Sequence, residues 1–159
     1  MRSPLGSRRD VFGCAGDKIA LKSNYGYIAV AEFNNTPYGN CKWAEEMCTF
    51  TVQDLGRDEI GDKIAFITYN NNYIIAESRS SYKTIVNRKN CSTWEKTFYV
   101  ERQNNGTFTL KTWRERYVVA NPNGGLTAAG TNAESFYVEC MKVILLLSCI
   151  FSAHIHLLL

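Results

Sequence analysis

The chain has 159 residues, of which 45% are hydrophobic and 13% aromatic, so a disordered chain is excluded and one domain with a sizeable core is expected. The formal net charge of +3 is too small to indicate nucleic-acid binding by electrostatics alone. The six cysteines contain no Cys-x-x-Cys pair, and both histidines fall in the last six residues. We therefore expect no metal site, no cofactor, and buried or half-buried free thiols.

Residues 1–13 are predicted to form a flexible leader. They contain Pro4, Gly6 and several charges, and they lack hydrophobic periodicity. No apolar segment follows Arg8 and Arg9, so the leader does not have the pattern of a signal peptide.

Residues 14–140 contain an internal repeat, which is the most informative feature of the sequence. The segment "GDKIALKSNYGYIAVAE" from Gly16 returns 45 residues later as "GDKIAFITYNNNYIIAE" from Gly61. A third copy, "GTFTLKTWRERYVVAN", begins at Gly106. Aligned without gaps, the copies share four sets of positions: Ile19, Ile64 and Phe108; Leu21, Phe66 and Leu110; Ile28, Tyr73 and Tyr117; and Ala31, Ala76 and Ala120.

Each copy ends with a Phe-x-Val segment, which begins at Phe50, Phe98 or Phe136. Alternating apolar and polar residues predict short β-strands, and segments rich in Asn and Gly predict the turns between them. No segment shows a sustained helical period, although residues 42–47 could form one helical turn. Three copies of about 44 residues, each with roughly four strands, predict an all-β β-trefoil of twelve strands, with a sandwich of short strands as the alternative.

In such a fold, Leu21, Phe66 and Leu110 would surround a pseudo-threefold axis in one core. Closure of six strands into a barrel makes the first and last strands neighbours. Cys14 and Cys140 would then lie near each other, so a disulfide between them is conceivable as an alternative to free thiols.

Residues 141–159, "MKVILLLSCIFSAHIHLLL", form a hydrophobic C-terminal tail. Its length is at the lower margin for a membrane span. The tail could be a membrane anchor, a lipid-anchor signal that lacks the usual polar spacer, or sequence foreign to the domain, which is the favoured interpretation. A membrane partner is expected only if the tail is a genuine anchor.

The motifs Gly-x-x-Ile-Ala-Leu, Tyr-Ile-x-Ala-Glu and Trp-Glu-x-x-Phe resemble those of the fascin-like, actin-crosslinking β-trefoil family. The second copy, with "TWEKTFYVE", carries the resemblance best, whereas Asn132 replaces the tryptophan in the third. The resemblance implies actin-filament binding, crosslinking or bundling, in the cytoplasm and associated with the cytoskeleton. It carries no actin site onto identified residues, because the motif residues build strands and turns. The region "FNNTPYGNCKWAEE", which matches a filament contact of fascin, has only one lysine.

No catalytic motif occurs in the sequence, so we expect a binding protein and not an enzyme. Two predicted turns carry basic side chains, and these form the candidate partner-binding surface: Arg88, Lys89, Arg114 and Arg116. An acidic partner such as actin would suit them, and solvated turns explain them nearly as well.

Carbohydrate binding, as a lectin-like or secreted β-trefoil, is the alternative function. Trp43, Trp94 and Trp113 could stack against sugars, although none follows the Gln-x-Trp pattern of ricin-type lectins. The alternative locations are accordingly secreted or membrane-anchored.

Overall fold

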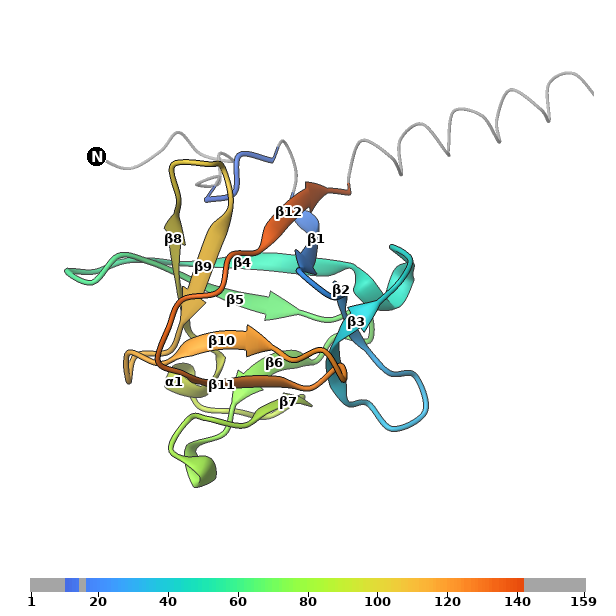
Figure 1. Cartoon of the computed structure of the whole chain (residues 1–159). Helices are drawn as coiled ribbons and strands as arrows, with labels where there is room; N and C mark the ends of the chain where they lie inside the picture. The colour runs from blue at the N-terminus through green and yellow to red at the C-terminus, as the bar shows by residue number, and fades with distance from the viewer. Residues whose placement is uncertain (1–10, 15–16, 142–159) are drawn as a thin grey trace, which may run out of the picture.

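The computed structural model describes residues 11–14 and 17–141, in which twelve strands and one short α-helix occur (Figure 1). The strands are β1 (Lys18–Ser23), β2 (Gly26–Val30), β3 (Pro37–Cys41), β4 (Phe50–Arg57), β5 (Asp62–Ile67), β6 (Tyr73–Ala76), β7 (Ile85–Arg88), β8 (Phe98–Arg102), β9 (Phe108–Lys111), β10 (Tyr117–Ala120), β11 (Leu126–Gly130) and β12 (Tyr137–Cys140). Helix α1 spans Thr93–Lys96, and the 3-10 turns η1 and η2 span Glu46–Cys48 and Ser78–Ser80. The predicted leader up to residue 10 and the tail from residue 142 lie outside the described residues.

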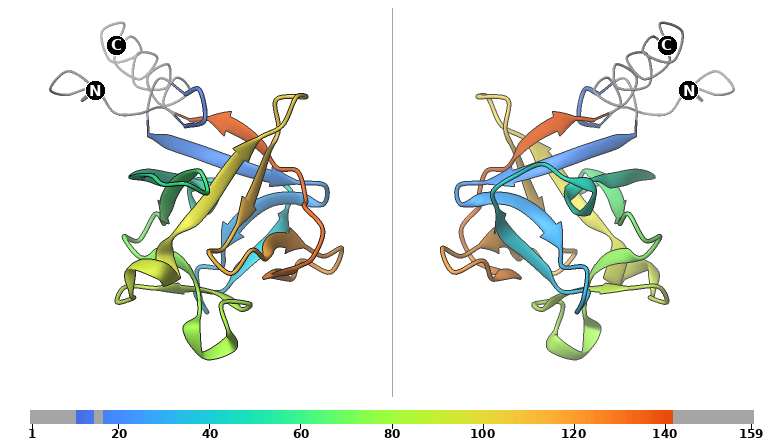
Figure 2. Two further views of the ribbon diagram at one scale, coloured as in Figure 1. Left: turned by 90° about the vertical axis from the view of Figure 1, so that its left-hand side faces the viewer. Right: turned by 90° about the vertical axis from the view of Figure 1, so that its right-hand side faces the viewer.

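Six strands form a closed antiparallel barrel, as the repeat predicted. Strand β1 pairs with β12 and β4, β5 pairs with β4 and β8, and β8 pairs with β9. The barrel closes between β9 and β12, where Phe108 and Phe136 exchange two backbone hydrogen bonds of 2.9 and 2.7 Å. Figure 2 shows this barrel from two sides, with the remaining hairpins at one end. Closure leaves the barrel strands without a free edge.

The register repeats three times around the barrel. The phenylalanine that closes each copy lies opposite the first apolar residue of the same copy: Phe50 opposite Ile19, Phe98 opposite Ile64, and Phe136 opposite Phe108. The valine two residues later pairs with the next copy: Val52 with Phe66, Val100 with Leu110, and Val138 with Leu21. The Phe-x-Val segments therefore join each repeat to its neighbour.

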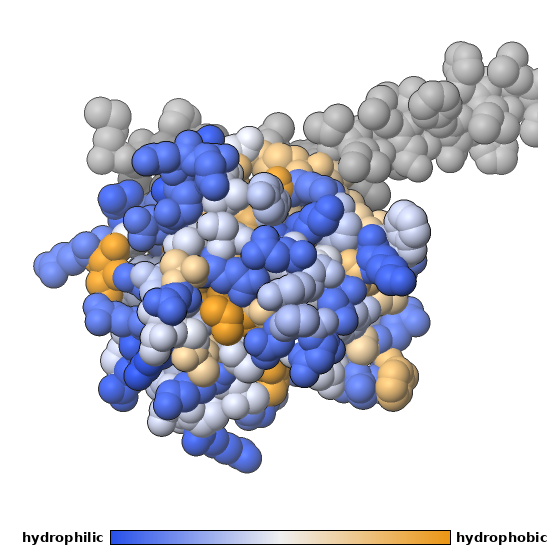
Figure 3. Space-filling model, in the orientation of Figure 1, coloured by the Kyte–Doolittle hydropathy of each residue, from blue (hydrophilic) through white to orange (hydrophobic). Residues whose placement is uncertain are grey.

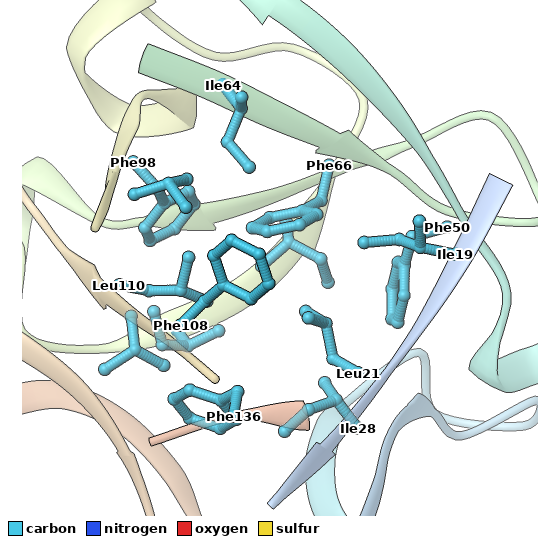
Figure 4. Packing of buried hydrophobic residues seen from close by; sticks show 14 of the residues in the cluster. Ile19, Leu21, Ile28, Phe50, Ile64, Phe66, Phe98, Phe108, Leu110 and Phe136 are labelled. Carbon is cyan, nitrogen blue, oxygen red and sulfur yellow. The ribbon is translucent and has the colours of Figure 1, made fainter. Parts of the chain in front are cut away.

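The hydrophobic core lies on the pseudo-threefold axis inside this barrel. Leu21, Phe66 and Leu110 are each 3% exposed, as the alignment predicted. Phe50 and Phe98 pack beside them, and Figure 4 shows these side chains pointing toward one another from the surrounding strands. The central cavity is only about 20 Å³, so the core is well filled.

Three hairpins, β2–β3, β6–β7 and β10–β11, cover one end of the barrel. The Gly39 N–H donates to the Gly124 carbonyl at 2.9 Å, and the Ala128 N–H donates to the Lys83 carbonyl at 2.8 Å. Gly124 has a φ of +95°, and a Cβ there would lie 2.6 Å from the side-chain oxygen of Asn40. Residues 121–125, an Asn- and Gly-rich segment, form the turn between β10 and β11, and this turn needs glycine at position 124 for the close approach.

The gapless alignment is wrong by one residue after the first turn. Tyr27, Tyr73 and Tyr117 are the equivalent residues, because they pair with Lys22, Ile67 and Lys111 at matching positions. The turn between β1 and β2 is one residue shorter than the other two, since Ser23 already pairs with Gly26. The buried sets are consequently Ile28, Ile74 and Val118, followed by Val30, Ala76 and Ala120, and Ala31 is only half-buried.

The expectation of free thiols is wrong for two of the six cysteines. Cys14 and Cys140 form a disulfide with their Cα atoms 5.4 Å apart, because closure of the barrel brings the first and last strands together. Phe12, assigned to the leader from the sequence, is 8% exposed, and its ring centroid lies 4.9 Å from that of Phe108. The disulfide thus fixes a segment that also contributes to the core. Of the described cysteines, Cys41, Cys48 and Cys91 are free.

Candidate functional site

Three aromatic side chains and one arginine meet at the capped end of the barrel, and we call them the aromatic cluster: Tyr82, Trp94, Trp113 and Arg114. The ring centroids of Trp94 and Trp113 are 5.4 Å apart, with an interplanar angle of 38°. The Tyr82 ring meets Trp113 edge-on at 5.3 Å, and the Arg114 guanidinium lies 4.2 Å from the Trp113 ring centroid. Trp94 is 43% exposed, so the cluster presents an aromatic face to solvent.

The cluster is assembled from three separate loops. Tyr82 follows η2 in the β6–β7 connection, Trp94 lies in α1, and Trp113 and Arg114 form the β9–β10 turn. Figure 1 shows α1 beside that turn. The cluster thus joins the cap of the second repeat to a hairpin of the third.

A capping box fixes the position of Trp94. The Ser92 side chain accepts a hydrogen bond from the Glu95 N–H at 3.3 Å, and a Glu95 carboxylate oxygen accepts from the Ser92 N–H at 3.0 Å. The other carboxylate oxygen accepts from the Ser78 N–H at 3.0 Å, which ties η2 to α1. Hydrogen bonds from the backbone of Ser92 and Ser78 hold the pKa of Glu95 below its ordinary value of 4.5. Glu95 therefore organises two of the three loops of the cluster.

We predict that Glu95→Gln lowers the free energy of unfolding by about 1–2 kcal/mol near neutral pH, because an amide cannot accept both sets of hydrogen bonds as a carboxylate does. A lowered folded-state pKa stabilises the fold above the unfolded pKa, and this stabilisation is lost as pH falls through the folded value. Urea unfolding at several pH values measures the effect. The difference between the two proteins should shrink in acid, and the exposed Glu101→Gln serves as the control. An equal loss in both variants would contradict the assigned role.

The loop that carries Tyr82 has an unusual backbone. Ser81 and Tyr82 both lie in the left-handed region, with φ of 57° and 63°, where residues other than glycine are uncommon. The Tyr82 N–H donates to the Glu77 carbonyl at 2.8 Å, and its side chain packs against the core. The surrounding contacts thus hold Tyr82 in a strained position against Trp113.

Trp113 is held by ring contacts and not by a polar anchor. Its indole N–H is buried, and among the described residues it has no hydrogen-bond partner. The Thr112 hydroxyl beside it is also buried without a partner in that part of the chain. Trp113→Phe therefore removes no hydrogen bond, which makes it a conservative variant for testing the aromatic face.

The four basic residues predicted as a binding surface have different surroundings. Arg88 ends β7, and its guanidinium pairs with the Glu77 carboxylate. Lys89 and Arg114 are exposed, and Arg116 is half-buried, with its carbonyl accepting the Thr112 N–H at 2.9 Å. Lys89 and Arg114 are therefore the more accessible members of the predicted surface.

A concave region lies on the side of the barrel, between the β4–β5 and β8–β9 hairpins. It encloses about 220 Å³ and is lined by charged residues of both signs, namely Arg57, Asp62, Glu101, Arg102 and Lys111. Tyr99 contributes to its wall, and its hydroxyl donates to the Asp58 carboxylate at 2.6 Å. Burial and this hydrogen bond raise the pKa of Tyr99 to about 12. Because cations and carboxylates are mixed here, the region favours no single class of ligand.

Among the described residues, no group of three or more His, Cys, Asp or Glu side chains is arranged to hold a metal ion. None of the helices in that part of the chain is long and apolar enough to span a membrane. The face in Figure 3 is mainly hydrophilic, with small, separate apolar patches.

Neither a protein-family profile nor a curated protein sequence matches this chain. Solved structures do match it. A mosquitocidal holotoxin aligns with a TM-score of 0.64 and 9% identity, over 78% of this chain and 17% of the toxin chain. The designed 3-fold symmetric protein ThreeFoil aligns with a TM-score of 0.62 and 8% identity, over 77% of this chain and 97% of its own. The fold is a β-trefoil.

The cytolethal distending toxin of Actinobacillus actinomycetemcomitans also has this architecture, with a TM-score of 0.58 and 13% identity, over 76% of this chain and 89% of the toxin chain. Identities this low establish the trefoil and leave its ligand open. None of these three structures is specific to the fascin-like family, so the sequence resemblance to that family remains a prediction. The trefoil spans about one sixth of the holotoxin chain.

Proposed function

We propose that this trefoil is a secreted, non-enzymatic protein that binds carbohydrate, and that the aromatic cluster is its binding site. The proposal rests on the exposed Trp94, which packs against Trp113 while Arg114 lies over the same ring. A sugar ring presents C–H groups on its faces and hydroxyls at its edge. An indole face can stack on the former, and guanidinium N–H groups can donate to the latter.

The hydrogen bonds that hold the loops of the aromatic cluster in place favour this function. Glu95 fixes α1 and η2, and the β9–β10 turn is closed by hydrogen bonds from Thr112 to Arg116 and from Glu115 to Thr112. A site held in this way loses little conformational entropy when a ligand binds. Trp43, although 71% exposed, has no comparable aromatic partner among the described residues.

The disulfide favours secretion over the cytoplasmic location expected from the family resemblance. Structural disulfides form in oxidising compartments and are rare in the cytosol. The Cys14–Cys140 bond joins the segment before β1 to the end of β12, and Phe12 belongs to the same core cluster as Cys14. Two of the similar structures are a mosquitocidal holotoxin and a cytolethal distending toxin, and a secreted trefoil is consistent with both.

Actin-filament binding is the second candidate, and the exposed Lys89 and Arg114 favour it. In this account the chain belongs with the fascin-like proteins and acts in the cytoplasm. The motif residues Trp94 and Glu95 now have roles in the cluster and the capping box, so the motif alone does not indicate a filament contact. A single trefoil crosslinks filaments only if it has two sites or self-associates.

A printed array of neutral and acidic oligosaccharides, probed with the full disulfide-bonded chain, tests the proposal against this alternative. We expect binding to a restricted set of glycans and no pelleting with filamentous actin above an actin-free control, at low and moderate salt. Pelleting with actin together with an empty array would overturn the proposal in favour of the second candidate.

A further inference from the structure

Two of the free cysteines, Cys41 and Cys48, lie beside the same backbone carbonyl group. The thiols of Cys41 and Cys48 each donate to the same acceptor, the Trp43 carbonyl oxygen, and each sulfur lies 3.4 Å from it. Burial, together with the nearby Cys41 thiol, raises the pKa of the Cys48 thiol to about 12. The two sulfurs therefore lie close together around one shared acceptor.

The barrel holds both cysteines in place. Cys41 ends β3 and pairs with Tyr27 of β2, and Cys48 ends η1 immediately before β4. The chain between them is short and projects Trp43, which is 71% exposed. Cys41 and Cys48 stay close because β2, which pairs with β3, and β4 both pair with β1.

The two thiols differ in accessibility. Cys41 is half-buried, whereas Cys48 is 0% exposed. A reagent in solution therefore reaches Cys41 first, and Cys48 is positioned behind it as the second thiol. Cys91 is also half-buried, but it lies beside α1, where Arg88, Glu95 and Lys96 surround it. It serves as a matched single-thiol control.

We infer that Cys41 and Cys48 form an oxidisable dithiol that closes into a second disulfide and clamps the loop bearing Trp43. The presence of the Cys14–Cys140 disulfide supports this, because conditions that maintain one disulfide also act on a neighbouring pair of thiols. The inference does not depend on carbohydrate binding, since the aromatic cluster lies on other loops.

The oxidant is a low-molecular-weight disulfide such as glutathione disulfide. The Cys41 thiolate attacks one of its sulfurs, so that a mixed disulfide forms and one glutathione thiolate leaves. The Cys48 thiolate then attacks the Cys41 sulfur and expels the second glutathione. The two cysteines lose two electrons to glutathione disulfide, and their two protons end on the two glutathione thiols.

Peptide mapping tests this step in the full chain. After overnight incubation with glutathione disulfide at about pH 8, remaining thiols are alkylated and the protein is digested with trypsin without reduction. Trypsin cleaves after Lys42, so the proposed bond joins two separate peptides, residues 23–42 and 43–57. We expect the linked pair as the main product, with neither Cys41 nor Cys48 recovered as an alkylated thiol.

Two variants make the result specific. Cys91→Ser should leave the linked pair unchanged, and Cys48→Ala should stop the reaction at a glutathione adduct on Cys41. Recovery of Cys41 and Cys48 as alkylated thiols, or of Cys41 only as an adduct in the unmodified chain, would overturn the inference. Linkage of Cys41 to Cys91 would overturn it as well.

Discussion

The Phe136→Ala variant is expected to lose about 3–5 kcal/mol of its free energy of unfolding. The Phe136 side chain is 0% exposed and lines the centre of the core, so its removal opens a cavity that the neighbouring strands cannot easily fill. Its backbone also makes the two hydrogen bonds with Phe108 that close the barrel. Loss of the side chain therefore weakens the packing at the point where β9 meets β12.

Urea unfolding with the Cys14–Cys140 disulfide intact measures this effect. Phe33→Ala is the matched control, because Phe33 is 91% exposed and its removal should change the free energy of unfolding by no more than about 0.5 kcal/mol. A loss below about 1 kcal/mol in Phe136→Ala would show that the core does not depend on the threefold set of closing phenylalanines.

Removal of the disulfide by the double substitution Cys14→Ser, Cys140→Ser should lower the free energy of unfolding by about 2–5 kcal/mol. The bond joins residues 126 positions apart, so it restricts most of the unfolded chain. It also holds the segment of Phe12, whose ring lies 6.4 Å from that of Phe66. Without the bond, the unfolded chain has more conformational entropy, so folding has a larger entropic cost.

Thermal unfolding of the double variant and of Cys91→Ser separates the disulfide from general effects of cysteine removal. Cys91 is free and half-buried, and its replacement should change stability little. If the double variant unfolds at the same temperature as the unmodified chain, the disulfide does not stabilise the trefoil.

Much of the fold could be predicted from the sequence because the same structural unit occurs three times. Leu21, Phe66 and Leu110 occupy equivalent places in the core, and the Phe-x-Val segments close each repeat as expected. The error in the alignment came from one turn. The first copy has one residue fewer in this turn, so every later position of that copy is shifted by one. The segment "GDKIA" is identical in the first two copies, but it precedes the turn and therefore does not reveal the shift.

The aromatic cluster could not be predicted, because its members are far apart in the sequence and meet only when two repeats pack. The basic residues were predicted on turns, but their surroundings depend on partners such as Glu77 for Arg88.

One signal for the position of Trp94 was present in the sequence. Ser92 followed three residues later by Glu95 is a capping-box pattern, and it would have placed Trp94 on a short helix. Similarly, the predicted helical turn at 42–47 is the 3-10 turn Glu46–Cys48 in the structure, displaced toward the buried Cys48.

The most direct test of carbohydrate binding at the aromatic cluster is to titrate three variants of the full chain with the glycan that binds most strongly on the array. Trp94→Ala should weaken binding by at least about tenfold, because it removes the exposed face of the cluster, and Trp113→Phe should weaken it by a smaller factor. Trp43→Ala, which removes an exposed tryptophan from another loop, should leave the affinity within about twofold. Equal affinities for Trp94→Ala and the unmodified chain would contradict carbohydrate binding at the aromatic cluster.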